Sequence, residues 1–266
     1  MRRLIIRPGG IGDFIVSLPA MECLAADYLE IWAARPNVAL ARFADRARSI
    51  SSTGLDLLGV TEPPERLIEE LRGFDSVVSW YGTNRPDLRE VVEQLGLPFQ
   101  FFPALPPEGA GMHATDFYLQ QVRTLAECAS DGIPRIVFPF TGGCPVLGDA
   151  ACEGFAVIHP FSGSPKKNCP LEKFRELAGI LEQSMPVRWC AGPEDPPLEG
   201  AVRIDDLYEL ACWLARARIY FGNDSGITHL AAAAGTPVVA LFGPTDPAVW
   251  APHGPNVQVT RWTRDV

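Results

Sequence analysis

The chain has 266 residues, of which 47% are apolar and 21% charged, and its formal net charge is −9. This is the composition of a globular protein long enough for one large domain or two ordinary ones. The acidic balance argues against nucleic acid as the main partner, because binding a phosphate backbone needs a basic face. No apolar run reaches the roughly 20 residues that span a bilayer, and we expect a cytoplasmic protein.

Cysteine and histidine usage points the same way. The seven cysteines are scattered and form no CxxC pair, so we expect free thiols that pack as small apolar side chains in a reducing compartment. The four histidines lack the spacing of metal ligands. We therefore predict neither a bound metal nor a cofactor.

Strand-like and helix-like segments alternate along the first half of the chain. The N-terminal apolar stretch resembles a short signal peptide, but Pro8 interrupts it and we interpret it as a strand. Strands are expected at 3–7, 29–34, 76–80 and 99–102, and helices at 13–27, 87–95 and 114–129. Such alternation favours a parallel sheet covered by helices.

Prolines and glycines interrupt this pattern between about residues 131 and 153, which indicates a linker. The alternation then resumes, with strands expected at 155–159, 187–191, 219–221 and 238–242 and helices at 171–183, 205–215 and from Ser225. We predict an α/β protein of two Rossmann-like, doubly wound domains, residues 1–150 and 151–266. The domains should face each other across a cleft, where ligands commonly bind.

The most informative motif joins a strand to a small-residue helix over residues 222–230, GNDSGITHL. Asp224 and Ser225 are good N-cap residues, and Gly226 would let a ligand approach the backbone. The free N–H groups and positive dipole end of this helix predict an anion site for a phosphate or pyrophosphate. His229, one turn further, either faces the same ligand or packs in the core. Asp246 is expected to cap a later turn.

Two further polar loops follow predicted strands. Ser162, Gly163 and Lys167 lie in the segment 159–170 and could supply hydroxyl, amide and ammonium groups to a pyrophosphate. The alternative is an exposed polar loop with solvated lysines. Glu194, in the turn 192–195, is either a ribose-binding carboxylate at a strand end or part of a surface turn.

The glycines after the first predicted strand, in the segment 9–13, do not match the dinucleotide fingerprint GxGxxG. A nicotinamide oxidoreductase is therefore the least favoured class. Asp13 lies where a helix begins. It is either a general base that takes a proton from an acceptor hydroxyl or an acid that only interacts with the helix dipole.

With these motifs in this order, the chain resembles glycosyltransferase family 9, the heptosyltransferase family of lipopolysaccharide biosynthesis. The similarity is carried by segments 7–13 with 18–20, 159–170, 192–194, and 223–230 with 240–247. The first domain is short for the family, and Cys169 stands where the family often has an aromatic residue. The resemblance implies a GT-B fold and an inverting, metal-independent transfer of a sugar from a nucleotide donor, usually ADP-heptose.

The resemblance also implies residue roles. Asp13 would be the catalytic base, Glu194 a nucleoside contact, and the remaining residues would bind the diphosphate and the donor sugar: Ser162, Gly163, Lys167, Asp224, Ser225, Gly226 and His229. The leading hypothesis is a glycosyltransferase acting on a cell-envelope glycan such as the lipopolysaccharide core, with a nucleotide-sugar donor and a glycan or glycolipid acceptor. A non-catalytic nucleotide-sugar-binding protein and a nucleotide-sugar epimerase remain alternatives.

A local basic stretch bears on the acceptor. It comprises Arg35, Arg42, Arg46 and Arg48. Either it contacts an anionic glycolipid at the inner membrane surface, which would make the protein a peripheral membrane protein, or it is the solvated face of a helix.

Overall fold

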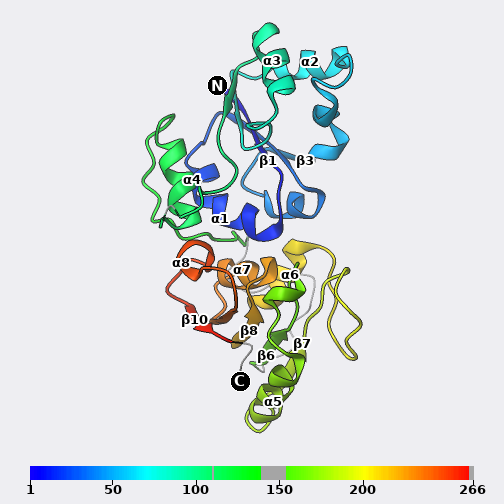
Figure 1. Ribbon diagram of the computed structural model, residues 1–266, viewed down its shortest axis with the longest axis vertical. Coiled ribbons are helices and arrows are strands. Elements are labelled where there is room, and N and C mark those ends of the chain that lie inside the picture. Colours follow the sequence, from blue (N-terminus) through cyan, green and yellow to red (C-terminus); the bar gives the residue numbers. More distant parts are fainter. Residues whose placement is uncertain (110, 139–153, 264–266) are drawn as a thin grey trace.

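The computed structural model describes residues 1–109, 111–138 and 154–263 and folds them into two α/β units, each built around a five-stranded parallel sheet (Figure 1). The elements of the first unit are β1 (Arg2–Arg7), α1 (Ile11–Glu22), β2 (Tyr28–Ala33), η1 (Arg35–Leu40), β3 (Arg46–Ser49), η2 (Ile50–Ser52), η3 (Leu55–Leu57), α2 (Glu65–Arg72), β4 (Ser76–Ser79), α3 (Pro86–Gln94), β5 (Phe99–Phe101) and α4 (Ala114–Val122).

The second unit begins after residues 139–153, which lie outside the described part. Its elements are β6 (Ala156–His159), η5 (Pro165–Lys167), α5 (Leu171–Leu181), β7 (Val187–Trp189), α6 (Leu207–Leu214), β8 (Ile219–Asn223), α7 (Gly226–Ala233), β9 (Val238–Phe242), α8 (Pro247–Trp250) and β10 (Val257–Arg261). Every strand and helix expected from the sequence is present, so the α/β prediction with two parallel-sheet units is confirmed.

Two strands and two α-helices were not predicted from the sequence, and two helices end earlier than expected. The missed strands β3 and β10 are the outer strands of their sheets, where a strand is buried less and its sequence is less apolar. The helices α2 and α8 have 8 and 4 residues, too few for a clear periodic pattern. Helix α1 ends at Glu22 instead of residue 27, and helix α4 ends at Val122 instead of residue 129.

The strand order of each sheet reverses once. The first sheet runs β3-β2-β1-β4-β5 and reverses between β1 and β4, as in Rossmann domains. The second runs β10-β9-β8-β6-β7 and reverses between β6 and β8, the flavodoxin-like variant of a doubly wound sheet. Ligands of open α/β sheets bind outside the carboxyl ends of strands at such reversals. The loops after β1, β6 and β8 are therefore the expected binding elements.

Alternate residues of the central strands face opposite sides of each sheet. In β1, Ile5 packs into one large apolar cluster, whereas Leu4 and Ile6 belong to a second cluster under α2 and α3. In β6, Val157 joins the large cluster and Ile158 packs against α5. This alternation follows from the two-residue repeat of a strand, and it buries both faces of each parallel sheet.

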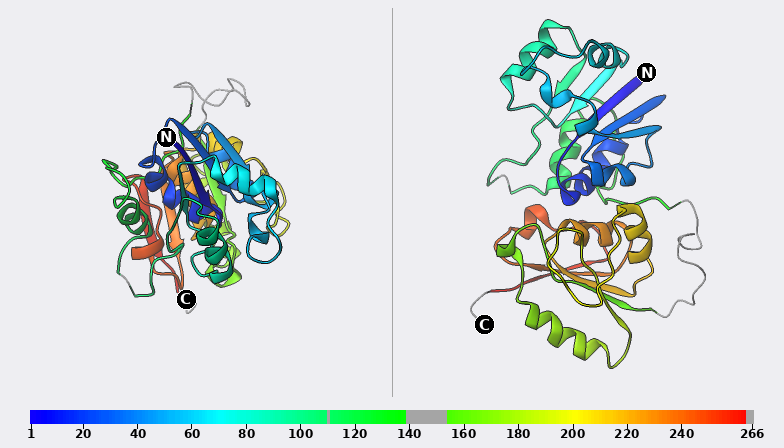
Figure 2. Two further views of the ribbon diagram at one scale, coloured as in Figure 1. Left: turned by 90° about the horizontal axis from the view of Figure 1, so that it is seen from above. Right: turned by 90° about the vertical axis from the view of Figure 1, so that its right-hand side faces the viewer.

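The large cluster continues from one unit into the other. It contains buried residues of α1 and α4 as well as of α6 and α7. Figures 1 and 2 show the first unit stacked on the second, with α1 lying against α7. The two units therefore share an apolar interface in which these two helices meet.

A disulfide joins Cys23, at the end of α1, to Cys128, in the segment after α4. The expectation of free thiols is wrong for this pair, because packing α1 against α4 places two cysteines 105 residues apart within bonding distance. It is correct for Cys169, Cys190 and Cys212, which are buried thiols outside any disulfide. Cys144 and Cys152 lie outside the described residues.

The basic stretch is not a helix face. Arg46 and Arg48 lie on β3, and Arg48 binds the carboxylates of Glu30 and Glu70 at 2.8 and 2.5 Å. The guanidinium of Arg42 stacks on the ring of Tyr208 in the second unit, 4.1 Å from its centroid. The helix-face alternative is therefore wrong, and contact with a membrane surface stays a prediction.

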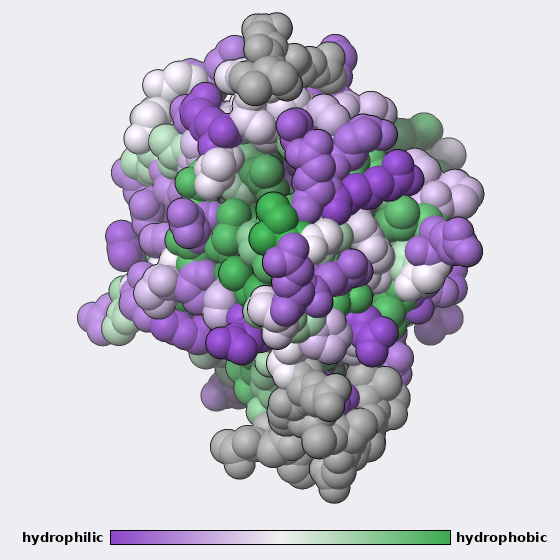
Figure 3. All heavy atoms as spheres, turned by 90° about the horizontal axis from the view of Figure 1, so that it is seen from below, coloured by the Kyte–Doolittle hydropathy of each residue, from purple (hydrophilic) through white to green (hydrophobic). Residues whose placement is uncertain are grey.

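The surface seen from the α5 end has apolar atoms gathered near its centre within a polar surround (Figure 3). The large apolar side chains that the second unit exposes include Ile180 and Val259.

Across the residues that the structure describes, no helix is both long enough and apolar enough to cross a membrane.

Candidate functional site

The turn between β8 and α7 has the geometry of a capped helix start. Ser225 is the N-cap, and its hydroxyl accepts a hydrogen bond from the amide of Thr228. The hydroxyl of Thr228 in turn donates to the carbonyl of Asn223. Of the two cap candidates, Ser225 takes the position, which leaves the carboxylate of Asp224 for another partner.

That partner is Lys167. Its ammonium nitrogen lies 2.7 Å from Oδ2 of Asp224, which joins η5 to the start of α7. The Asp224 side chain is only 6% exposed, whereas that of Lys167 is 36% exposed. The structure thus brings together two predicted site residues that are 57 positions apart, and it places an accessible cation at the positive end of a helix.

The loop that carries Lys167 is held in shape by its own polar groups. The hydroxyl of Ser162 lies 2.8 Å from the carbonyl of Ser164 and 2.6 Å from Oδ1 of Asn168, so its proton is used inside the loop. Gly163 is exposed, and a Cβ built there would have no neighbour within 4 Å. The loop therefore offers the backbone around Gly163 to a ligand more readily than the hydroxyl of Ser162.

Asn223 fixes the same loop to the sheet. Its side-chain amide donates to the carbonyl of Pro160 at 2.7 Å, and its Oδ1 accepts from the amide of Cys169 at 3.0 Å. The side chain is fully buried. Its role was missed because it connects segments about 60 residues apart, although an asparagine at a strand end beside the Asp-Ser-Gly turn was a usable signal.

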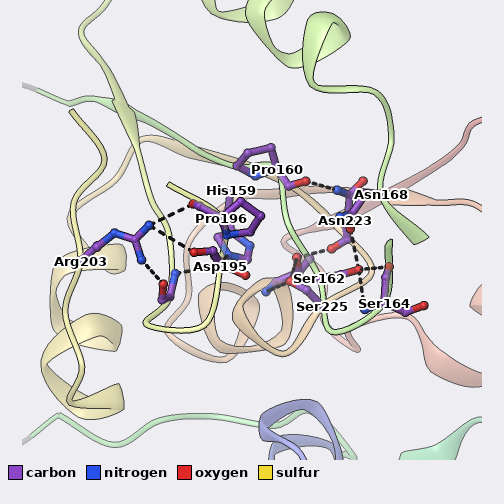
Figure 4. A network of polar contacts seen from close by, with 12 residues as sticks. His159, Pro160, Ser162, Ser164, Asn168, Asp195, Pro196, Arg203, Asn223 and Ser225 are labelled. Carbon is purple, nitrogen blue, oxygen red and sulfur yellow. Dashed lines mark hydrogen bonds and ion pairs between the residues drawn. The ribbon is translucent and has the colours of Figure 1, made fainter. Parts of the chain in front are cut away.

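Glu194 lies in a separate loop after β7. It is exposed, next to an open pocket of about 670 Å³ lined by Pro193, Asp195, Pro197, Leu198, Glu199 and Arg203. The loop is tied to the end of β6 through Asp195, whose Oδ2 lies 3.0 Å from Nε2 of His159 (Figure 4). No sequence motif pointed to this pair, since its members belong to different loops.

Asp13 lies in the first turn of α1, where its carboxylate accepts a hydrogen bond from the amide of Gly10 at 3.1 Å. Behind it, the buried Arg7 donates to the carbonyl of Asp13 and the hydroxyl of Tyr118, both at 2.9 Å. Asp13 is thus a helix-terminus acid by position. Its carboxylate is only partly buried, so this position leaves it available as a base.

The start of α1 lies directly against the start of α7. A Cβ built at Gly226 would lie 2.6 Å from Cβ of Ile11, and one built at Gly12 would lie 3.2 Å from the ring of His229. Gly226 therefore permits close contact between two helices, whereas the sequence analysis expected close approach of a ligand. The contact places Asp13 of the first unit beside the α7 turn of the second.

His229 lies in this contact and is buried. Burial lowers its pKa to about 4, although the nearby carboxylates of Asp224 and Asp13 act in the opposite direction. The imidazole is therefore neutral at pH 7, and its Nδ1 makes no hydrogen bond within the described residues. A neutral imidazole can donate one hydrogen bond and accept another, but it cannot supply a positive charge.

The remaining expectations concern Asp246 and metals. Asp246 is the N-cap of α8, where its carboxylate accepts from the amide of Ala248 at 3.1 Å, so the capping prediction is confirmed. A search of the described ranges finds no group of three or more metal-ligating side chains. The site thus consists of a base candidate, Asp13, a partly exposed lysine paired with Asp224, the starts of α1 and α7, and two polar loops.

Comparison with known proteins finds a family match for the part of the chain that contains the second unit. Residues 139–265 match the model of glycosyltransferase family 9 (heptosyltransferase). This segment of the chain is therefore similar to that family. The match contains every predicted donor-site residue, from Ser162 to His229, and confirms the resemblance stated from the sequence.

Individual relatives agree with the family match. Lipopolysaccharide heptosyltransferase 1 of Escherichia coli K12 is 32% identical over 123 residues, which are 42% of this chain and 39% of that protein. Lipopolysaccharide heptosyltransferase 3 of the same strain is 38% identical over 121 residues, 40% of this chain and 35% of the relative. The matched segments thus span less than two fifths of these relatives.

The fold comparison covers nearly the whole chain. A family 9 glycosyl transferase from Veillonella parvula DSM 2008 has a TM-score of 0.76 at 19% identity, over 98% of this chain and 86% of that one. E. coli heptosyltransferase WaaC, solved with ADP, has a TM-score of 0.73 at 19% identity, over 98% and 93%. Both units therefore share the fold of family 9 enzymes, including the first unit that the family model does not match.

Proposed function

We propose that this protein is an inverting glycosyltransferase that moves a heptose from a nucleotide donor such as ADP-heptose to a cell-envelope glycan. The observation that carries the proposal is the meeting of α1 and α7, which places Asp13 beside a helix start where Lys167 is paired with Asp224. A base candidate and a site for a departing diphosphate thus lie on opposite sides of one domain contact.

The chemistry follows from this separation. An inverting displacement needs a base at the acceptor hydroxyl and stabilisation of the negative charge that develops on the leaving diphosphate. Asp13 is proposed as the base. Lys167 and the N–H groups of α7 would stabilise the diphosphate, so the proposed reaction draws on protein groups and needs no metal ion.

The donor and acceptor classes rest on the relatives. Matched relatives are named as lipopolysaccharide heptosyltransferases, and similar folds were solved with ADP and with ADP-2-deoxy-2-fluoro heptose. We therefore propose an ADP-linked heptose as donor and a lipopolysaccharide-type glycan as acceptor, with Glu194 contacting the nucleoside.

The first experiment compares ADP, UDP and GDP as ligands by calorimetry and thermal shift. ADP at about 100 times its dissociation constant should raise the free energy of unfolding by about 2.7 kcal/mol. Lys167→Met should weaken ADP binding by about tenfold or more, since a charge-assisted contact is lost. Preference for UDP or GDP would change the donor, and absence of all nucleotide binding would contradict the proposal.

Two controls separate binding from folding. Lys167→Met also leaves Asp224 buried without its cation, which is destabilising, so Lys167→Met/Asp224→Asn serves as a variant without the buried charge. Gly163→Ala adds a methyl group in open space and should leave stability unchanged while weakening ADP binding, if phosphate oxygens contact this backbone.

Transfer itself is tested with ADP-heptose and glycan acceptors. Asp13→Asn should retain ADP binding but lose transfer, and NMR of the product should show an inverted anomeric configuration. Donor binding without transfer to any acceptor would favour the non-catalytic alternative. Conversion of the donor alone would favour an epimerase.

A further inference from the structure

A hydrogen bond between His159 and Asp195 connects the two loops that the proposed donor would have to bridge. His159 is the last residue of β6, and its Nε2 lies 3.0 Å from Oδ2 of Asp195 in the loop after β7. The side chains are 3% and 18% exposed. The same carboxylate oxygen accepts a hydrogen bond from the amide of Gly192 at 2.6 Å. One oxygen thus closes the turn 192–195 and ties it to the neighbouring strand.

The charge of Asp195 decides which group donates in its hydrogen bond with His159. Burial disfavours the charged form of Asp195, but hydrogen bonds from His159 and the Gly192 amide outweigh burial and lower the pKa of the carboxyl group. Asp195 is therefore ionised at neutral pH and can only accept. Nε2 of His159 must then carry the hydrogen, and its Nδ1 makes no hydrogen bond within the described residues.

Arg203 holds the same turn from the other side. Its guanidinium donates to the carbonyl oxygens of Gly192 and Pro196, the latter at 3.1 Å (Figure 4). The turn is therefore fixed at both ends. Glu194 lies between these anchors, and its carboxylate makes no hydrogen bond or ion pair with the described part of the chain. Of the two acidic residues in this turn, Asp195 is used to hold the turn, whereas Glu194 can bind a ligand.

His159 is also the first residue of the loop that carries Lys167. The next residue, Pro160, is bound by the buried amide of Asn223 at 2.7 Å, so this end of the loop cannot move independently of the sheet. The contact between His159 and Asp195 therefore holds the Glu194 turn in a fixed position relative to the Lys167 loop.

We propose that Asp195, held by His159, is a positioning residue that fixes Glu194 at the place where it binds the ribose hydroxyls of a nucleoside diphosphate. Lys167 would bind the diphosphate part of the same ligand, so affinity depends on the separation of the two loops. This inference rests on the proposed function. Preorganised contacts avoid the entropy cost of ordering a loop when the ligand binds.

The test compares ADP with inorganic pyrophosphate, which lacks ribose, by calorimetry and competition. Asp195→Ala should weaken ADP binding by about tenfold, as expected for loss of a hydrogen bond to a charged group, and should leave pyrophosphate binding unchanged. Lys167→Met should weaken binding of both ligands. Glu194→Ala should reproduce the loss for ADP, and Glu194→Ala/Asp195→Ala should be no weaker than Glu194→Ala alone, because Asp195 acts through Glu194.

Conservative variants separate the loss of one hydrogen bond from a general loss of folding. His159→Gln places an amide N–H near the position of Nε2 and should retain ADP affinity, whereas His159→Leu should lose as much as Asp195→Ala. Asp195→Asn keeps an acceptor for the Gly192 amide and should lie between Asp195→Ala and the unaltered protein. Thermal unfolding confirms that each variant is folded before binding is compared.

Three results would overturn the inference while leaving the proposed function intact: equal losses for ADP and pyrophosphate in Asp195→Ala, no loss for ADP, or additive losses in the double variant. Absence of nucleotide binding by the unaltered protein would overturn both.

Discussion

At the scale of single residues, the neutral imidazole of His229 makes stability depend on pH. Burial lowers its pKa in the folded protein to about 4, whereas an unfolded histidine titrates near 6.5. Between these values the unfolded chain binds a proton that the folded protein does not. The free energy of unfolding should therefore fall as the pH is lowered from about 6.5 to about 4, by up to about 1.4 kcal/mol for each pH unit.

Urea unfolding at several pH values measures this effect. His229→Gln should lose this part of the pH dependence and retain the part due to His113, whose pKa is lowered by burial in the same direction. An unchanged pH dependence in His229→Gln would show that the imidazole is not the group responsible.

Residue roles were predicted from sequence where one segment carried the whole signal. Ser225 as helix cap and Asp246 as turn cap need only local geometry, and both were predicted. The pairing of Lys167 with Asp224 and the anchoring by Asn223 depend on strands 60 residues apart becoming neighbours. The local sequence shows which functional groups are present, but it does not show how far apart they lie in the folded protein.

At the scale of elements, the contact between α1 and α7 depends on glycine. Gly226→Ala would place a Cβ 2.6 Å from Cβ of Ile11 and 3.1 Å from the backbone of Gly12. Neither neighbour can rotate away, so α1 must shift. We expect a loss of about 1–3 kcal/mol in the free energy of unfolding, typical of overpacking.

Gly179→Ala is the matched control. Gly179 lies in α5, and a Cβ there meets nothing within 4 Å. Alanine should be neutral or stabilise the helix by about 0.5–1 kcal/mol. Equal effects of the two substitutions in chemical denaturation would contradict a tight contact at Gly226.

The strands show which elements can be recognised from the sequence alone. Buried central strands such as β1 and β8 have apolar runs and were found, whereas the edge strand β3 reads Arg-Ala-Arg-Ser and was not. The edge strand forms because β2 offers it a partner and because Glu30 and Glu70 bind Arg48. Its stability comes from tertiary contacts that no local pattern records.

At the scale of the whole molecule, the disulfide Cys23–Cys128 closes a long segment of the first unit. The two cysteines are 105 residues apart. Restricting so long a loop in the unfolded chain typically stabilises a protein by about 2–4 kcal/mol. Cys23→Ser/Cys128→Ser should lower the free energy of unfolding by that amount.

Unfolding in urea with and without a thiol reductant gives the measurement. The unaltered protein should lose stability on reduction, and the double-serine variant should not respond. A response of the variant equal to that of the unaltered protein would assign the effect to other cysteines.

The sequence by itself determined the alternation of strands and helices, the capped turn of α7 and the resemblance of the second half to glycosyltransferase family 9, because these depend on residues close together in the chain or on an ordered set of motifs. Tertiary structure decided the disulfide, the flavodoxin-like order of the second sheet, the glycine contact of α1 with α7, the ion pair Lys167–Asp224 and the hydrogen bond His159–Asp195. Each of these joins segments far apart in sequence. Their geometry is fixed only when the apolar faces of both sheets are buried and the strand ends are brought side by side.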